Sequence, residues 1–148
     1  MRLQHLGVLA AALIGMAGSA QAASLLEKNF WLSGPNYDGV LPVCQDPSVT
    51  GTIASRFAHT EATFWNSSLV IQAFDHQREI AFRPWGANYI PRRFCAARAM
   101  TSDGRERTVS YSIAEDLGAI GVTWGVEWCV SGLDRPLAYA PNCKMAGP

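Results

Sequence analysis

Four cysteines constrain the fold of this chain most strongly, because a segment typical of an export signal precedes all of them. Residues 1–5 are a short basic start that contains Arg2, residues 6–17 are an apolar run, and residues 18–22 end in an A-x-A pattern. This organisation predicts a secretory signal peptide with cleavage after Ala22. An apolar run of 12 residues is shorter than the roughly 20 that a membrane-spanning helix needs. We therefore expect residues 23–148 to reach the periplasm or the medium without a membrane anchor.

Export decides how the cysteines are interpreted. An even number of cysteines in an exported chain favours disulfides, because the compartment is oxidising. A metal site is not expected, since the sequence has no C-x-x-C and neither His59 nor His76 stands at a ligand spacing from a cysteine. No glycine-rich phosphate loop is present either, and we expect no cofactor. The cysteines expected to form two disulfides are Cys44, Cys95, Cys129 and Cys143.

Length and charge set further bounds. Removing 22 of the 148 residues leaves 126, the size of a single domain with its own hydrophobic core. The whole chain has 12 Lys+Arg and 12 Asp+Glu, and the signal segment contains only Arg2, so the mature net charge is 11 − 12 = −1. A nearly neutral domain has no long-range attraction to nucleic acid, and no nucleic-acid partner is expected.

The first regular element of the mature chain is predicted to be a helix from Pro47 to about Trp65. Asp46 can accept backbone N–H bonds at the N-cap, and proline suits the first turn. Arg56, His59 and Glu61 fall off the expected buried stripe. The residues of that stripe follow one another at helical spacing, and they are Val49, Ile53, Phe57, Thr60 and Phe64.

The remaining chain predicts strands. Residues 69–74 and 79–82 indicate either one long, bulged strand or two strands joined at residues 75–78. Residues 93–100 and 107–113 flank Asp103-Gly104, the preferred pair for a two-residue type I′ hairpin turn. Residues 123–131 predict a last strand. The expected fold class is α+β, with one N-terminal helix packed on an antiparallel β-meander of about four strands, stapled by disulfides.

The expected turn also sets a register. Pairing Ser102 with Arg105 places Met100 opposite Arg107 and Phe94 opposite Ile113, so even-numbered residues 94–100 would share the face of Val109 and Tyr111. On the last strand, Trp124, Val126, Trp128 and Val130 would share one face and Cys129 the other. Cys95 and Cys129 would then lie on one face, two strands and about 10 Å apart, beyond the 4.4–6.8 Å that a disulfide spans. The favoured pairs are therefore Cys44–Cys95 and Cys129–Cys143, because the short tail can fold back over the strand before it.

A binding surface is the leading functional hypothesis. Six arginines lie between residues 83 and 107 against Asp103 and Glu106, and they either pair locally or form a patch for an anion or a partner. Trp85 stands in a Pro-Trp-Gly loop beside them, and loops often carry function. The candidate binding residues are thus Trp85, Arg92 and Arg93, for an unknown protein or small-molecule ligand of the envelope.

Two alternatives belong to other classes. A small hydrolase-like envelope enzyme would use His76 with Asp75, or a buried Glu127, as proton-transfer groups; it requires a cleft that gathers these residues. The competing interpretation of Glu127 is an ion pair with an arginine on the neighbouring strands. An accessory subunit of a cell-envelope complex would instead need a large exposed apolar patch.

Five segments of the carboxyl half resemble a family of small exported proteins from alphaproteobacteria. The resemblance extends over residues 64–148. It implies bacterial export and adds no activity, ligand or partner. The segments are 89–95 (YIPRRFC), 102–105 (SDGR), 109–113 (VSYSI), 125–135 (GVEWCVSGLDR) and 139–143 (YAPNC).

Overall fold

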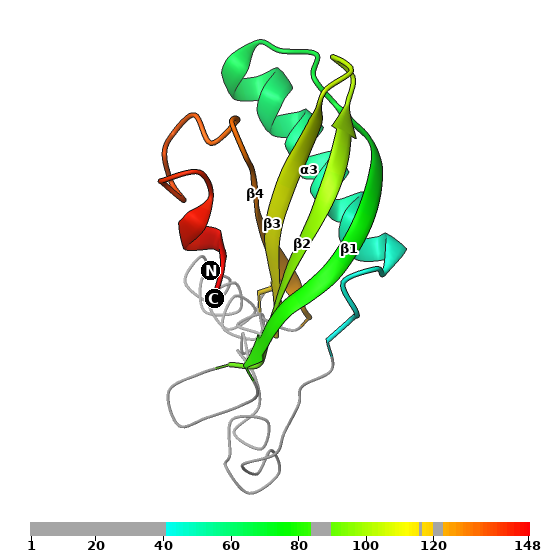
Figure 1. Ribbon diagram of the computed structural model, residues 1–148, viewed down its shortest axis with the longest axis vertical. Coiled ribbons are helices and arrows are strands. Elements are labelled where there is room, and N and C mark those ends of the chain that lie inside the picture. Colours follow the sequence, from blue (N-terminus) through cyan, green and yellow to red (C-terminus); the bar gives the residue numbers. More distant parts are fainter. Residues whose placement is uncertain (1–40, 84–89, 116, 120–122) are drawn as a thin grey trace, which may run out of the picture.

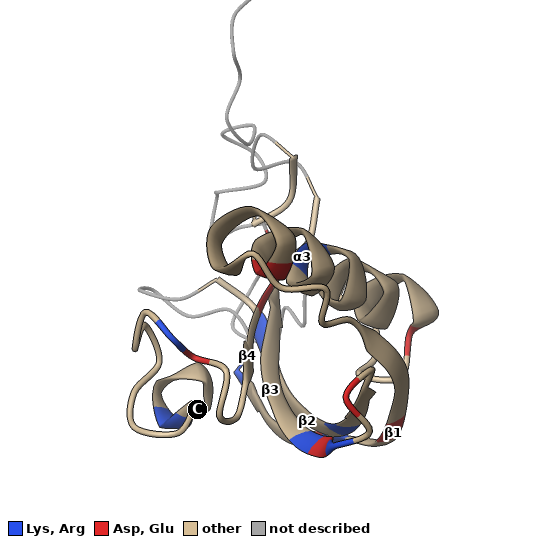
Figure 2. Ribbon diagram, turned by 90° about the horizontal axis from the view of Figure 1, so that it is seen from above, with Lys and Arg blue, Asp and Glu red and all other residues tan. Residues whose placement is uncertain are grey.

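The computed structural model describes residues 41–83, 90–115, 117–119 and 123–148. In this part of the chain, a helix lies across one face of a four-stranded antiparallel sheet with the order β1-β2-β3-β4, and the carboxyl-terminal tail lies beside β4 (Figures 1 and 2). The expected α+β meander with two disulfides is confirmed. The elements are α3 (Pro47–Trp65), β1 (Ile71–Arg83), β2 (Arg92–Thr101), β3 (Glu106–Ala114), β4 (Gly125–Val130) and the short 3₁₀ helix η2 (Lys144–Ala146).

Both ends of α3 are defined by local chemistry. The Asp46 carboxylate accepts hydrogen bonds from the backbone N–H of Ser48 at 2.8 Å and from its hydroxyl at 2.6 Å, and these bonds lower the pKa of Asp46. At the other end, Asn66 adopts a left-handed conformation with φ 46° and donates its N–H to the Glu61 carbonyl. The predicted bounds of the helix are confirmed.

The buried face of α3 differs from the predicted one at its last turn. Val49, Ile53 and Phe57 are buried as expected, but the next buried residue is Glu61, 2% exposed, whereas Phe64 is 67% exposed. The spacing of four therefore continues unbroken to residue 61. A carboxylate can occupy this buried position because it has a cationic partner, described below. The prediction that Phe64 belongs to the buried stripe is wrong, and so is the prediction that Glu61 lies off it.

β1 is one long strand, the first of the two predicted alternatives. Its pairing with β2 shifts in register between Asp75 and Arg78, where His76 has a positive φ of 52°. The Gln77 carbonyl at this bulge accepts a hydrogen bond from the Gln45 side chain at 2.9 Å. β1 is an edge strand, and a bulge with charged neighbours protects such an edge from pairing with another chain.

The β2–β3 turn has three residues in its loop rather than the predicted two. The Thr101 N–H donates to the Arg105 carbonyl at 3.0 Å, which leaves Ser102, Asp103 and Gly104 in the loop. Gly104 has φ 75°, the left-handed conformation that closes a three-residue hairpin loop of this kind. The expected pairing of Ser102 with Arg105 is wrong by one residue.

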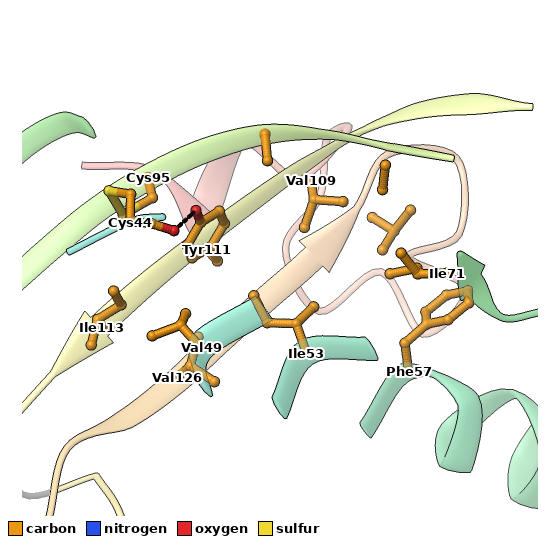
Figure 3. Close-up of a cluster of buried hydrophobic side chains, with 13 residues drawn as sticks. Cys44, Val49, Ile53, Phe57, Ile71, Cys95, Val109, Tyr111, Ile113 and Val126 are labelled. Atoms are coloured by element: carbon orange, nitrogen blue, oxygen red, sulfur yellow. Dashed lines mark hydrogen bonds between the residues drawn. A yellow bond between two sulfur atoms is a disulfide. The ribbon is translucent and has the colours of Figure 1, made fainter. Parts of the chain in front are cut away.

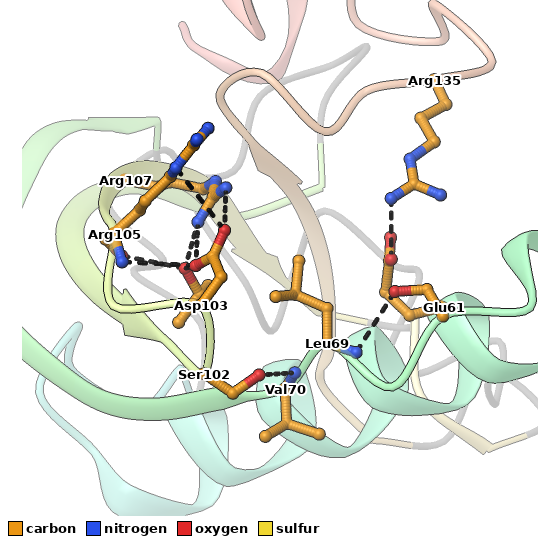
Figure 4. A network of polar contacts seen from close by, with 10 residues as sticks. Glu61, Leu69, Val70, Ser102, Asp103, Arg105, Arg107 and Arg135 are labelled. Atoms are coloured by element: carbon orange, nitrogen blue, oxygen red, sulfur yellow. Dashed lines mark hydrogen bonds and ion pairs between the residues drawn. The ribbon is translucent and has the colours of Figure 1, made fainter.

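Asp103 stabilises this longer loop. Its carboxylate accepts hydrogen bonds from the Thr101 hydroxyl at 2.6 Å and from Arg107 at 2.7 and 2.8 Å (Figure 4). The Arg107 guanidinium and then the Thr101 hydroxyl hold the pKa of Asp103 well below its ordinary value. These bonds across the turn favour the three-residue loop over the two-residue one.

The change of one residue reverses the faces of β2 relative to β3. Ala97 pairs with Val109 and Cys95 with Tyr111, so the odd-numbered residues of β2 face α3, and the predicted face of residues 94–100 is wrong. Cys95 lies in the main core and Cys129 in the smaller cluster on the opposite face. The favoured disulfides are present, but these cysteines are separated by the sheet itself rather than by two strand spacings on one face.

The main core lies between α3 and the sheet (Figure 3). Tyr111 is fully buried, its hydroxyl donates to the Cys44 carbonyl at 2.7 Å, and burial raises its pKa to about 12. The Cys44–Cys95 disulfide joins the residues before α3 to β2. On the other face of the sheet, the Cys129–Cys143 disulfide and Ala146 of η2 form the second cluster. Through this cluster the tail packs against β4.

The disulfides bear on where the protein works. Both disulfides fit a compartment outside the reducing cytoplasm. Within the described ranges, no helix combines the length and apolar character needed to cross a membrane.

Candidate binding site

A cavity of about 440 Å³ lies between the last turns of α3, β4 and tail residues 133–139. Its volume falls in the range of ligand pockets, roughly 300–1,000 Å³. Thr60 and Glu61 of α3 are among its polar lining residues. The aromatic residues in its lining are Phe57, Phe64, Trp65, Trp128 and Tyr139.

The tail forms the outer wall of the cavity because its own bonds fix its shape. The Cys129–Cys143 disulfide holds the tail against β4 with a Cα–Cα distance of 5.5 Å. Within the tail, the Asp134 carboxylate accepts the backbone N–H groups of Ala138 at 3.0 Å and Tyr139 at 2.8 Å. These bonds hold the loop in the shape that forms the outer wall, and the cavity lies between this loop and α3.

One ion pair links the tail to α3. Arg135 Nη2 donates to Glu61 Oε2 at 2.9 Å (Figure 4), and the Arg135 guanidinium carbon lies 5.2 Å from the centre of the Trp65 ring. The Glu61 side chain is 2% exposed and that of Arg135 is 33% exposed. The arginine compensates a carboxylate that would otherwise be buried without a countercharge.

Exposed apolar side chains flank the cavity. Phe64 is 67% and Trp65 38% exposed, and both belong to the lining. Leu137, 70% exposed, stands between the lining residues Pro136 and Ala138. Apolar side chains gathered around a cavity are typical of sites that bind an apolar ligand or partner.

The arginines predicted to bind a partner engage the protein's own carboxylates. Arg92 donates to Glu127 at 2.6 Å and to the Ser112 hydroxyl at 3.2 Å. Arg93 pairs with Glu79, and its guanidinium lies 5.0 Å from the Phe82 ring centre. Neither arginine lines the cavity, and Trp85 lies outside the described residues. Their role in binding stays a prediction. The expected ion pair between Glu127 and an arginine is present, but its partner Arg92 belongs to β2, two strands away from β4 rather than next to it.

The proton-transfer candidates do not form one site. His76 Nδ1 lies 2.6 Å from Asp75 Oδ2, but these side chains are 61% and 76% exposed. Glu127 belongs to β4, at the opposite edge of the sheet. His59 is exposed on α3. In the part of the chain that the structure describes, no group of three or more His, Cys, Asp and Glu residues could hold a metal ion.

The residues of the cavity were largely invisible in the sequence. Trp128 was expected in the core, and it packs edge-on against Phe57 at 5.9 Å while also lining the cavity. Glu61 had one usable signal, because it continues the spacing of four set by Val49, Ile53 and Phe57. The tail has no periodicity, so nothing in it indicated a cavity wall.

No protein-family model, curated protein or solved structure matches this chain. The geometry of the cavity is therefore the basis for its proposed function.

Proposed function

We propose that this protein is an exported, non-enzymatic binding protein that holds a small, mainly apolar ligand in the cavity between α3, β4 and the tail. One observation carries the proposal: a cavity of about 440 Å³ has five aromatic side chains among its lining residues. Removing apolar ligand surface from water stabilises a complex by about 25 cal/mol per Å² before the costs of association. Aromatic walls add shape-specific contacts to that term.

Binding is favoured over catalysis by the distribution of titratable groups. Asp75 and His76 are exposed on β1, and Glu127 pairs with Arg92 on β4. Proton-transfer catalysis needs such groups within hydrogen-bond reach of one substrate. The cavity contains the carboxylates Glu61 and Asp134, and both already accept hydrogen bonds from the protein.

Export to the periplasm or the medium is the second part of the proposal. It is supported by the signal pattern of residues 1–22 and by two disulfides in a chain without free cysteines among the described residues. The resemblance to small exported alphaproteobacterial proteins points the same way.

Filling the cavity tests the proposal. Titration with decanol, followed by tryptophan fluorescence, is expected to give a saturable change, because Trp65 and Trp128 line the cavity. Thr60→Phe places a ring in the cavity wall and is expected to weaken binding about tenfold, equivalent to about 1.4 kcal/mol. The matched control is Thr63→Phe, the same substitution on the same helix at an exposed position outside the lining.

Thr63→Phe should bind decanol like the wild type. Equal binding by both variants, or no saturable signal with the wild type, would contradict the proposed site.

A further inference from the structure

One carboxylate in the cavity wall uses only part of its hydrogen-bonding capacity. Glu61 lines the cavity and is 2% exposed. Its Oε2 accepts a bond from Arg135, whereas no side chain or backbone group of the described residues donates to Oε1. A carboxylate offers about four acceptor positions, so Glu61 keeps unused capacity in a place where water is scarce.

The oxygen Oε1 belongs to a side chain of the cavity lining. Among the described residues, Arg93 Nε is the only fully enclosed side-chain polar atom without a hydrogen-bond partner, so Glu61 Oε1 is not an enclosed, unsatisfied acceptor. A ligand in the cavity can reach this acceptor with an N–H or O–H donor.

The charges around the cavity favour a cation. Two carboxylates, Glu61 and Asp134, line it, and one cation, Arg135, pairs with Glu61 from beside the lining. Two further cations act on this region, and each is paired with a carboxylate: Arg107, which acts on Glu61, with Asp103, and Arg92, which acts on Tyr139, with Glu127. With both pairs included, the local balance is 3 − 4 = −1. The pKa of Tyr139 is raised, first by burial and then by the negative charges of Glu127 and Asp134, which the positive charge of Arg92 offsets in part. An anionic ligand would meet both carboxylates in a setting of low polarity.

The aromatic rings favour a cation as well. The faces of Trp128 and Tyr139, both in the lining, carry the negative end of the ring quadrupole, and organic ammonium groups bind against such faces. The Trp65 ring already has the Arg135 guanidinium against it at 5.2 Å. The cavity lining therefore combines the two features that recognise organic cations, a carboxylate and aromatic side chains.

We infer that the ligand is an organic ammonium carried on an apolar body, whose N–H donates to Glu61 Oε1 while the apolar part fills the aromatic cavity. The inference rests on the proposed function and names the chemical class of its ligand.

Three probes with the same alkyl chain test it: decylamine, decanol and decanoate, at neutral pH and below their micelle-forming concentrations. Tryptophan fluorescence of the wild type is expected to give a dissociation constant for decylamine at least about tenfold lower than that for decanoate, with decanol between them. Glu61→Gln is expected to weaken decylamine binding about tenfold and to leave decanol binding unchanged. Glu106→Gln, which alters an exposed carboxylate at the hairpin end, is the matched control and should bind all three probes like the wild type.

Decanoate binding as tightly as decylamine would overturn the inference, and so would a preference for decylamine that survives Glu61→Gln. The wild-type series decides the question even if the variant is unstable. Saturable decanol binding without cation preference would leave the proposed function in place. Failure of all three probes to bind would contradict both.

Discussion

Replacing Cys44 and Cys95 together by alanine is expected to lower the free energy of unfolding by about 4 kcal/mol, measured by chemical denaturation. The disulfide joins residues 51 apart in sequence, and the entropy of closing a loop of that length in the unfolded chain corresponds to about 4 kcal/mol. Both cysteines are also buried in the main core, at 2% and 3% exposed. This disulfide therefore stabilises the contact of the pre-helical segment with the sheet.

The double variant of Cys129 and Cys143 is the control. This pair closes a loop with a sequence separation of 14, which predicts a smaller loss of about 3 kcal/mol. Because it holds the outer wall of the cavity, its removal should abolish saturable decanol binding in protein that is still folded. A larger stability loss from the tail disulfide than from Cys44–Cys95 would contradict this division of roles.

Phe57→Ala is expected to lower the free energy of unfolding by about 3–5 kcal/mol, the usual cost of truncating a buried phenylalanine. Phe57 is 1% exposed, belongs to the main core and contacts Trp128 edge-on. The substitution leaves an apolar void between α3 and β4, which surrounding side chains fill only in part. Thermal and chemical denaturation measure the loss.

Phe64→Ala provides the matched control on the same helix. Phe64 is 67% exposed, so its truncation should change the free energy of unfolding by about 0.5 kcal/mol or less. Phe64 lines the cavity, so its truncation should weaken decanol binding while the free energy of unfolding stays nearly unchanged. If Phe64→Ala lowered the free energy of unfolding as much as Phe57→Ala does, Phe64 would be a core residue, and this account of the helix would be contradicted.

The elements of the fold could be predicted where the determining chemistry is local. Asp46 caps the first turn of α3, and Pro47 has the backbone angle that this turn requires. Both residues are recognisable from a few neighbouring positions of the sequence. The alternation on β4 placed Val126, Trp128 and Val130 correctly on the core face. These signals need no knowledge of distant residues.

The register of the hairpin could not be predicted in the same way. Asp103-Gly104 suits a two-residue turn and also a three-residue loop with a left-handed glycine. The choice depends on Asp103 bonding across the turn to Thr101 and Arg107, which the preferred dipeptide alone does not reveal. Since strand side chains alternate, a change of one residue moved Cys95 to the opposite face.

The site depends on distant contacts even more strongly. Glu61 and Arg135 are 74 residues apart, and the folded tail brings the arginine that pairs with the buried carboxylate. The arginines between residues 83 and 107 were visible as a charge excess, yet Arg92 and Arg93 pair with Glu127 and Glu79. The sequence indicated an arginine partner for Glu127 without identifying Arg92, and it indicated no partner for Arg93.

The most direct test of the cavity as the ligand site is nuclear magnetic resonance of the tryptophan indole N–H groups during a titration with decylamine. Trp65 and Trp128 line the cavity, whereas Trp124 packs against the main core outside the lining. The account predicts that the indole signals of Trp65 and Trp128 shift saturably and that the Trp124 signal stays in place. Signals of Trp65 and Trp128 that do not move at saturating decylamine would contradict it.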